Sequence, residues 1–345
     1  MTIALVTATP GPGLAALEAA GRALGALEIW SPLATPSWLA RIPGPLGVYA
    51  GRRLRAHDLA APHVLAVDAA LRAWARDRTD RRYRASFALR AVIDRWAAAE
   101  IRRRRPRLVI APCLAARRTF AAARAVDAAT VLVMDVPLLR ALHRDLDRAA
   151  AVRPERAFLR RFRAPSSAIA RQEAERVLAD LIVVRGPYAH ALCLADGIPA
   201  SRLAIMPPPT SLLRAPPQRT GRVRLAGLAA ARHGVDTALA ATRRLGLTLV
   251  VRTGEGTEPV DLAQLPGVAS DDGPVDAIVC PAICETYAPE LAATELPVIA
   301  SPMASLDGSG PDPYDVAAVA AALGTTKPRA HPVFPALADR LAALY

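Results

Sequence analysis

Short apolar runs alternate with alanine-rich helical stretches along most of the chain, and this alternation constrains the fold more than any other feature. The first apolar run, Thr2–Thr9, is followed by a Pro-Gly-Pro-Gly turn and a helical stretch over Leu14–Leu27. A strand, a glycine-rich turn and a helix in that order open a βαβ unit. Runs that are apolar throughout are typical of parallel strands buried on both faces. Further strands are expected at 108–111, 130–134, 181–184, 223–226, 248–252, 277–280 and 298–300, and helices at 86–103, 115–128, 166–179, 234–245, 290–294, 315–323 and 334–344.

A proline-rich stretch divides the chain into two parts. Residues 206–221 contain five prolines and no hydrophobic period, which is typical of a linker. The alternation of strands and helices restarts after it, and 345 residues are about twice the usual size of one domain. We therefore expect a doubly wound, Rossmann-like domain over 1–206, a linker over 207–221, and a second, shortened Rossmann-like domain with terminal helices over 222–345. Ligands of such sheets bind at the carboxyl ends of the strands, here in the cleft between the domains.

Charge is divided unequally between the two parts. The first 250 residues carry a net charge of +22 and the last 95 carry −9. A basic first part attracts anions, and the densest arginine runs lie at 102–107 and 153–171. Since 43 of the 44 basic residues are arginine, solvated helix faces in an arginine-rich composition are one explanation. Contact with an anionic membrane surface and contact with a protein partner are others. Nucleic acid is not expected, because neither zinc-finger spacing nor RNA-binding aromatics accompany the charge.

Targeting and metal-binding patterns are not expected from this sequence. It contains no uncharged apolar run of 18 residues and begins without a basic, then apolar, leader. We therefore expect a cytoplasmic protein, with peripheral contact at the inner face of the membrane as a further alternative. The four cysteines are too scattered for a disulfide scaffold, and Cys280 and Cys284 lack a second pair of ligands for zinc.

Four segments, in order, resemble the GT-B glycosyltransferases, particularly the large retaining family 4. The first segment begins with a glutamate-bearing helix, followed by Ala179-Asp180 and an apolar strand. It continues with a Gly-hydrophobic-Pro turn and ends in a strand that closes on proline. The second pairs Leu225-Ala-Gly227 with His233-Gly-Val-Asp236, and the third is an apolar strand that closes on Gly254-Glu-Gly256. The fourth resembles the donor-site signature, in which two glutamates precede Leu-Pro-Val-Ile-Ala. The segments span 173–207, 225–240, 249–256 and 276–301.

This resemblance implies a fold of two Rossmann-like domains that face each other across a cleft. It also implies an activity: transfer of a sugar from a nucleotide-sugar, held by the second domain, to an acceptor held by the first. The family generally retains the anomeric configuration and needs neither a bound metal nor another cofactor. Gly11 and Gly13, in the first turn, are expected in a loop on the acceptor side. The nucleotide base, the sugar and the acceptor (lipid, glycan, small molecule or protein) stay open.

The phosphate-binding residues depart from the family pattern. The family has Arg directly after the glycine that corresponds to Gly227, and Lys six residues after that glycine. This chain has Leu228 and His233 at those positions. The family pair neutralises the departing diphosphate, a role that no apolar side chain can take. Arg232 with His233, or Arg252, are the candidates for that role here.

The two expected carboxylate positions also depart from the pattern. Register against Leu-Pro-Val-Ile-Ala places Glu290 at the second family glutamate, which binds ribose hydroxyls. Glu285 is then the first glutamate only if the intervening loop is shortened, with Thr286 and Tyr287 beside the donor phosphates. Otherwise Glu285 is a loop residue, and Glu290 is a residue favoured at a helix N-terminus. Asp135 follows the strand where the family often has His, and either touches a sugar or caps a turn.

Two other kinds of protein fit the sequence. A non-catalytic GT-B relative, acting as a binding or partner subunit, fits the missing Arg/Lys pair and the shortened second domain. Another GT-B enzyme, such as a sugar-nucleotide epimerase, is a third alternative that no residue favours. Nucleotide affinity together with donor hydrolysis separates the first alternative from a glycosyltransferase.

Overall fold

A computed structural model describes most of the two expected domains. The described residues are 2–7, 12–32, 79–206, 219–228, 230–252, 266–270, 273–284, 296–305, 309–325 and 337–344, with isolated positions 64, 67, 68, 70, 71, 74 and 294. Structural statements below concern these residues.

The first domain is built on a parallel sheet of six strands. Its strand order is β2-β1-β3-β4-β5-β6, so the winding direction reverses between β1 and β3. The strands form where short, fully apolar runs occur; β5, for example, is buried at each of its positions. Their bounds are β1 Thr2–Val6, β2 Ala26–Trp30, β3 Leu108–Pro112, β4 Ala129–Val133, β5 Leu181–Val184 and β6 Leu203–Ile205.

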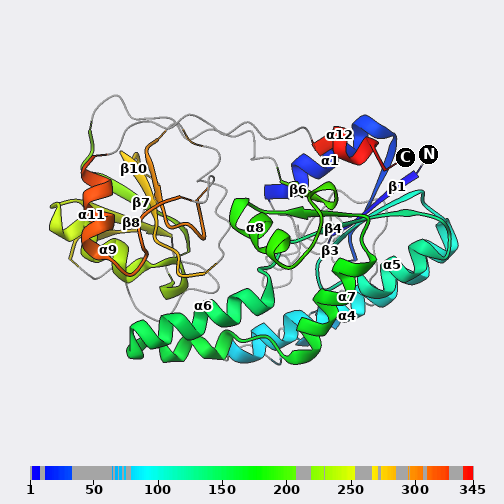
Figure 1. Cartoon of the computed structure of the whole chain (residues 1–345), viewed down its shortest axis with the longest axis horizontal. Helices are drawn as coiled ribbons and strands as arrows, with labels where there is room; N and C mark the ends of the chain where they lie inside the picture. Colours follow the sequence, from blue (N-terminus) through cyan, green and yellow to red (C-terminus); the bar gives the residue numbers. More distant parts are fainter. Residues whose placement is uncertain are drawn as a thin grey trace, which may run out of the picture.

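Helices cover both faces of this sheet, and each face has its own buried core (Figure 1). The larger core lies under the helices that follow β2, β3, β4 and β5, and the smaller one lies under the first and last helices of the chain. The helices are α1 Pro12–Leu24, α4 Thr79–Arg104, α5 Arg117–Arg124, α6 Leu139–Val152, α7 Ser166–Leu178 and α8 Pro187–Ala195, with 3-10 turns η2 Pro154–Phe162 and η3 Ala200–Arg202.

The second domain repeats this plan with a five-stranded parallel sheet. The order β11-β10-β7-β8-β9 reverses its winding between β7 and β10. One core lies under α9 and α11, and a second lies on the opposite face of the sheet. The elements are β7 Arg222–Leu228, η4 Ala231–His233, α9 Val235–Arg244, β8 Thr248–Arg252, β9 Val268–Ala269, β10 Ala277–Cys280, β11 Val298–Ala300 and α11 Val316–Gly324.

Two doubly wound parallel domains in tandem are the GT-B arrangement, so the predicted fold class is confirmed. The domains meet through apolar as well as polar contacts. Ala231, Ile283 and Cys284, from the carboxyl edge of the second sheet, belong to the same buried cluster as the main core of the first domain.

The second strand was missed: its first two residues, Ala26 and Leu27, belong to the stretch predicted as helix, and the next three were assigned to no element. The helix begins at Pro12 and ends at Leu24, before Gly25, and Ala26–Trp30 then pairs with β1. Ala, Leu and Glu are good helix formers, but burial of Ile29 and Trp30 against the sheet decides the conformation. The start of α1 also corrects the expected loop: Gly13 lies in the first helical turn, where a preceding proline is well accommodated.

The last helix differs from the domain boundaries expected from sequence. Residues 222–345 were assigned to one domain, but α12 (Leu337–Ala342) packs on α1 and β6 of the first domain. Leu341 is fully buried there, and Arg340 Nη2 donates to the carbonyl oxygens of Ser201 at 2.6 Å and Leu203 at 3.1 Å. The chain therefore crosses between the domains twice.

Across the described parts of the chain, no helix combines the length and apolar character needed to cross a membrane.

Candidate functional site

An irregular backbone segment of the second domain lies at its switch point, at the carboxyl end of β7. Arg224 is in register with Val250 and Leu228 with Arg252, so a four-residue step on β7 matches a two-residue step on β8. This bulge contains Gly227, whose φ of +78° favours glycine. Bulges redirect side chains and backbone at the rims of sheets, frequently beside functional sites.

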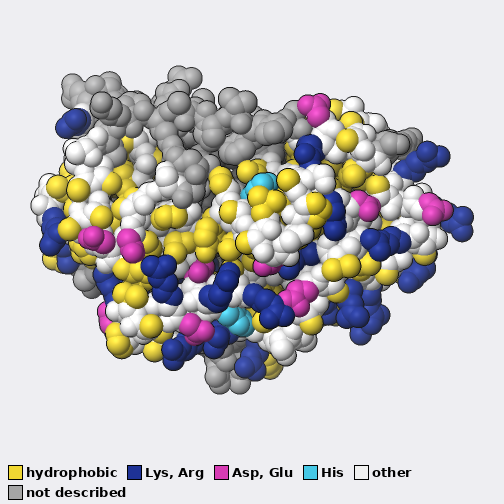
Figure 2. Space-filling model, viewed as in Figure 1, with side chains coloured by type: hydrophobic (Ala, Val, Ile, Leu, Met, Phe, Trp, Pro, Cys, Tyr) yellow, Lys and Arg dark blue, Asp and Glu magenta, His cyan; other side chains and the backbone are white. Residues whose placement is uncertain are grey.

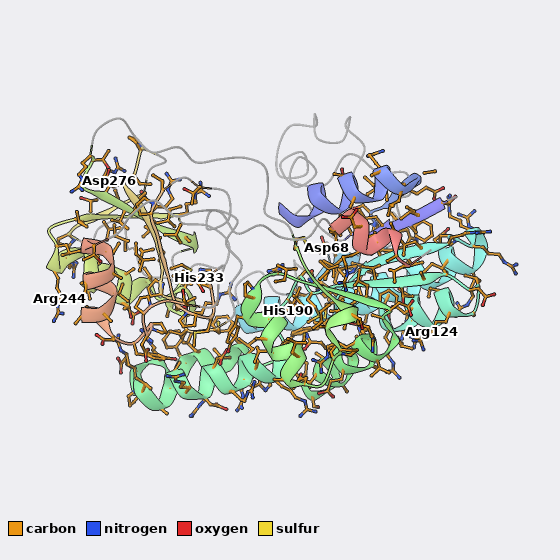
Figure 3. All side chains as sticks on the ribbon, turned by 45° about the horizontal axis from the view of Figure 1, so that its top comes forward. Asp68, Arg124, His190, His233, Arg244 and Asp276 are labelled. Carbon is orange, nitrogen blue, oxygen red and sulfur yellow. The ribbon has the colours of Figure 1, made fainter. Side chains whose placement is uncertain are left out.

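The bulge packs against His233, one of the predicted donor residues. A Cβ at Gly227 would lie 3.1 Å from His233 Nδ1, so a larger residue here would press on the imidazole. His233 is 8% exposed and ends the short turn η4. Figure 3 shows His233 on the side of the second domain that faces the first, whereas Arg244 and Asp276 lie on its outer side. The predicted residues Gly227 and His233 are therefore brought together at the inner edge.

Gly234 fixes the other side of this turn. Its φ is +75°, and a Cβ at this position would lie 1.9 Å from the carbonyl oxygen of Pro281, which follows β10. Ile283 N–H donates to the carbonyl oxygen of Arg232 at 3.1 Å. The turn 231–234 is thus packed tightly against the residues that end β10, and the switch point has a defined backbone shape.

Three basic residues predicted for the donor site lie along this edge. Arg232 and His233 belong to η4, and Arg252 ends β8 as an exposed side chain. Arg252 is in register with Leu228, the residue that occupies the family's arginine position. Arg252 therefore lies at the carboxyl end of the strand beside β7, next to the position where the resembling family has its arginine.

Several predicted site residues lie outside the described residues and stay predictions. These are Gly11, Glu285, Thr286, Tyr287 and Glu290.

On the first domain, Asp135 follows the end of β4 and forms an ion pair with Arg90 of α4. Arg90 Nη1 and Nη2 donate to its two carboxylate oxygens at 3.0 and 2.6 Å. Arg90 also donates to the carbonyl oxygen of Cys113, which follows β3. Both side chains are largely buried, at 17% exposure for Arg90 and 28% for Asp135. Asp135 thus holds two strand ends together. Arg90 carries no local sequence signal, because it lies 45 residues earlier in a helix rich in arginine.

The end of β3 is held by a second buried carboxylate that the sequence did not single out as a site residue. Glu175 accepts hydrogen bonds from the backbone N–H groups of Leu114 at 2.6 Å, Ala116 at 2.9 Å and Arg117 at 3.1 Å. Burial raises the pKa of Glu175 to about 7, although the bonds from Ala116 and Leu114 oppose that rise. Leu114 has a φ of +68°, which is rare for leucine. The fully buried Glu175 stabilises this strained turn and the start of α5.

Two acidic residues of α6, Asp145 and Asp147, have partners inside the first domain. Asp145 lies 3.4 Å from the Tyr188 hydroxyl, and Asp147 pairs with Arg163 at 2.7 Å. Burial raises the pKa of Asp145 to about 6. Within the described ranges, no three His, Cys, Asp or Glu side chains are grouped so that they could hold a metal ion.

Several solved structures are similar to this chain over most of its length. The glycotransferase of kitacinnamycin is 16% identical with a TM-score of 0.47, covering 99% of this chain and 93% of that one. The glycosyltransferase SnogD from Streptomyces nogalater is 17% identical with a TM-score of 0.41, covering 100% and 99%. A UDP-N-acetylglucosamine 2-epimerase from Rickettsia bellii is 11% identical with a TM-score of 0.48, covering 95% and 89%.

These similarities extend to transferases and epimerases alike, so they do not decide between the two reactions. No family model matches the chain. No curated protein matches it either.

Proposed function

We propose that this protein is a glycosyltransferase that binds a nucleotide-sugar at the switch point of its second domain. The observation that carries the proposal is that Arg232 and His233 of η4, and Arg252 at the end of β8, lie at the carboxyl edge of the sheet, where His233 packs beside the bulged Gly227. Ligands of doubly wound sheets bind at this edge. Two arginines at this edge suit a diphosphate better than they suit a neutral ligand.

In this proposal the chain stabilises the leaving diphosphate and positions the acceptor. Negative charge grows on the β-phosphate as the bond to the sugar breaks, and Arg252 with the η4 residues neutralises it. The reaction needs no metal and retains the anomeric configuration, as the family resemblance implies. Glu290 and Glu285 are proposed to contact the nucleotide, and Glu290→Ala is expected to weaken its binding.

The acceptor is proposed to bind at the carboxyl edge of the first sheet. The Arg90–Asp135 pair shapes that edge, since both carboxylate oxygens accept bonds from one guanidinium. Figure 2 shows many arginine side chains over the helices of the first domain. The arginines at the end of α4, exposed at Arg102, Arg103 and Arg105, suit peripheral contact with an anionic membrane or an anionic acceptor.

A thermal-shift panel of nucleoside diphosphates and nucleotide-sugars tests this function. A ligand present at about 100 times its Kd adds ~2.7 kcal/mol to the free energy of unfolding, which is readily visible as a raised Tm. Products of the nucleotide-sugar that binds then identify the reaction. Released or transferred sugar supports the proposal, an isomerised nucleotide-sugar identifies an epimerase, and a folded protein that binds no nucleotide identifies a non-catalytic relative.

A further inference from the structure

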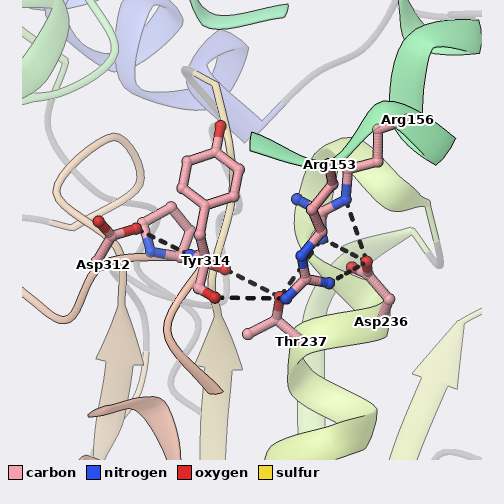
Figure 4. A network of polar contacts seen from close by, with 7 residues as sticks. Arg153, Arg156, Asp236, Thr237, Asp312 and Tyr314 are labelled. Carbon is pink, nitrogen blue, oxygen red and sulfur yellow. Dashed lines mark hydrogen bonds and ion pairs between the residues drawn. The ribbon is translucent and has the colours of Figure 1, made fainter. Parts of the chain in front are cut away.

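A polar joint connects the two domains directly beside the proposed donor site. It consists of Arg153 and Arg156 from the first domain, Asp236 and Thr237 from the first turn of α9, and Tyr314 from the segment before α11 (Figure 4). Figure 1 shows α6, which leads into Arg153, extending along the second domain. From the sequence, this arginine run had three explanations: a solvated helix face, contact with an anionic membrane and contact with a protein partner.

Arg156 is the centre of the joint. Its side chain is 2% exposed, and its Nε donates to Asp236 Oδ2 at 3.1 Å, with a further bond from Nη2 to the same oxygen. Arg153 Nη1 donates to this oxygen as well, at 3.1 Å. A guanidinium this deeply buried depends on its charge partner, because an unpaired buried charge is strongly unfavourable. The contact therefore resists separation of the domains.

Tyr314 joins a third part of the chain to the same cluster. The guanidinium carbon atoms of Arg156 and Arg148 each lie 5.5 Å from its ring centroid, within the range of cation–π attraction. Arg153 Nη2 donates to the Tyr314 carbonyl oxygen at 3.3 Å. The hydroxyl of Thr237 donates to the carbonyl oxygen of Pro313 at 2.9 Å. Together these contacts fix the first turn of α9 against both the first domain and the segment 313–314.

We propose that Arg156, although it belongs to the first domain, is a positioning residue for the donor site of the second. This inference rests on the proposed function. Asp236 lies two residues after Gly234 and three after His233, so the turn that carries the donor cations is held at its end by Arg156. A nucleotide that requires an ordered turn then binds more tightly when the two domains are in contact through Arg156. Because coupling between two equilibria is reciprocal, binding of the nucleotide also stabilises this contact.

Hydrogen exchange of the turn tests the joint without any ligand. Three amides report on the turn: His233, Gly234 and Ile283, each bonded to a carbonyl oxygen of the segment 230–232. In Arg156→Gln we expect their exchange to accelerate about tenfold, while β3 and β4 of the first domain keep the wild-type rates. Asp236→Asn removes the charge of the same ion pair at a side chain that is 41% exposed, so it should disturb the packing less. It replaces Arg156→Gln in the experiment if that variant does not fold.

Arg176→Gln is the matched control. Arg176 is 14% exposed and pairs with Asp196, 47% exposed, at 2.7 Å, and this pair lies wholly inside the first domain. The control should leave the three amides unchanged. Unchanged exchange in both Arg156→Gln and Asp236→Asn would contradict the claim that this contact orders the turn. An equal acceleration in Arg176→Gln would contradict it as well.

Nucleotide affinity tests the positioning role itself. If a nucleoside diphosphate binds the wild type, Arg156→Gln should weaken its Kd at least fivefold and Arg176→Gln should not. Equal affinity in Arg156→Gln and wild type would overturn the positioning role. If no nucleotide binds the wild type, the proposed function and the positioning role fail together, and the exchange rates still show whether Arg156 orders the turn.

Discussion

Asp135 Oδ2 lies 2.6 Å from Arg90 Nη2, and the same arginine bonds the carbonyl oxygen of Cys113, so one guanidinium ties the ends of β3 and β4 together. The resembling family often has His at this strand end. In this chain the position is Asp135, and its carboxylate pairs with Arg90. Its carboxylate is used inside the first domain.

Asp135→Asn should therefore lower stability. The substitution leaves Arg90 largely buried without its anion, and we expect a loss of about 1–3 kcal/mol in the free energy of unfolding, measured by urea denaturation. The double variant Arg90→Gln/Asp135→Asn should recover part of that loss. Additive losses in the two single variants would show that the ion pair contributes nothing to stability.

Gly234→Ala should be among the most damaging small substitutions in the second domain. Its Cβ would lie 1.9 Å from the Pro281 carbonyl oxygen, in a left-handed conformation, and we expect a loss of about 3 kcal/mol or more. Gly246→Ala is the control, because Gly246 has a φ of +64° and nothing within 4 Å of its Cβ position. It should cost only about 1 kcal/mol. Equal Tm values for the two variants would contradict the close packing of the switch point.

Glu175 should make stability depend on pH. Its pKa of about 7 in the folded protein exceeds the ordinary value of 4.5, so the folded state holds the proton more tightly. The unfolding free energy then falls as pH rises from about 4.5 to 7, by up to ~3 kcal/mol, and is level above that range.

Glu175→Gln removes this titration and separates it from that of other groups. The amide also turns a donor toward backbone N–H groups, at a cost of about 1–3 kcal/mol. The deficit of the variant relative to wild type should therefore shrink between pH 5 and pH 8 in urea unfolding. A deficit that stays constant over this range would show that burial does not raise the pKa, because a pKa lowered by the three N–H groups changes stability only below about pH 4.5.

Leu341→Ala should destabilise the first domain although the residue is almost the last in the chain. Leu341 is fully buried against α1 and β6, and its truncation is expected to cost about 2–4 kcal/mol. Leu245→Ala, at a side chain that is 40% exposed, should change stability by less than about 0.5 kcal/mol. Hydrogen exchange in this variant should become faster in β1 and β6. Faster exchange in β7 and β8 instead would show that α12 packs on the second domain and would contradict its assignment to the first.

Local sequence patterns predicted most of the fold. Apolar runs bounded by glycine, proline or charge identify strands such as Leu181–Val184 and Ala277–Cys280 at their observed bounds, because buried parallel strands need apolar side chains on both faces. β2 was missed because Ala26 and Leu27 form helices well and were included in the predicted helix, which left too short an apolar run to indicate a strand. α12 was assigned to the wrong domain because no local pattern states which sheet a crossing helix packs on.

The candidate site was predicted only where its signal is local. Gly227, Arg232 and His233 lie within seven residues and follow a strand, so their proximity could be read from the sequence. Arg90 and Arg156 find their partners 45 and 80 residues away, and their arginine-rich surroundings hide them. Arg252 was a candidate on charge alone, and its register with Leu228 could not be predicted, because it depends on how β8 pairs with β7.

Calorimetric titration of nucleoside diphosphates into the wild type, Arg252→Gln and Arg244→Gln tests the central claim most directly. Arg252 ends β8 at the proposed donor edge, whereas Arg244 is also an exposed arginine but lies on the outer side of the domain (Figure 3). We predict that one nucleotide binds the wild type, that Arg252→Gln weakens its Kd at least tenfold, and that Arg244→Gln leaves it unchanged. Binding of no nucleotide to the folded wild type, or equal affinity in all three proteins, would contradict a donor site at the switch point of the second domain.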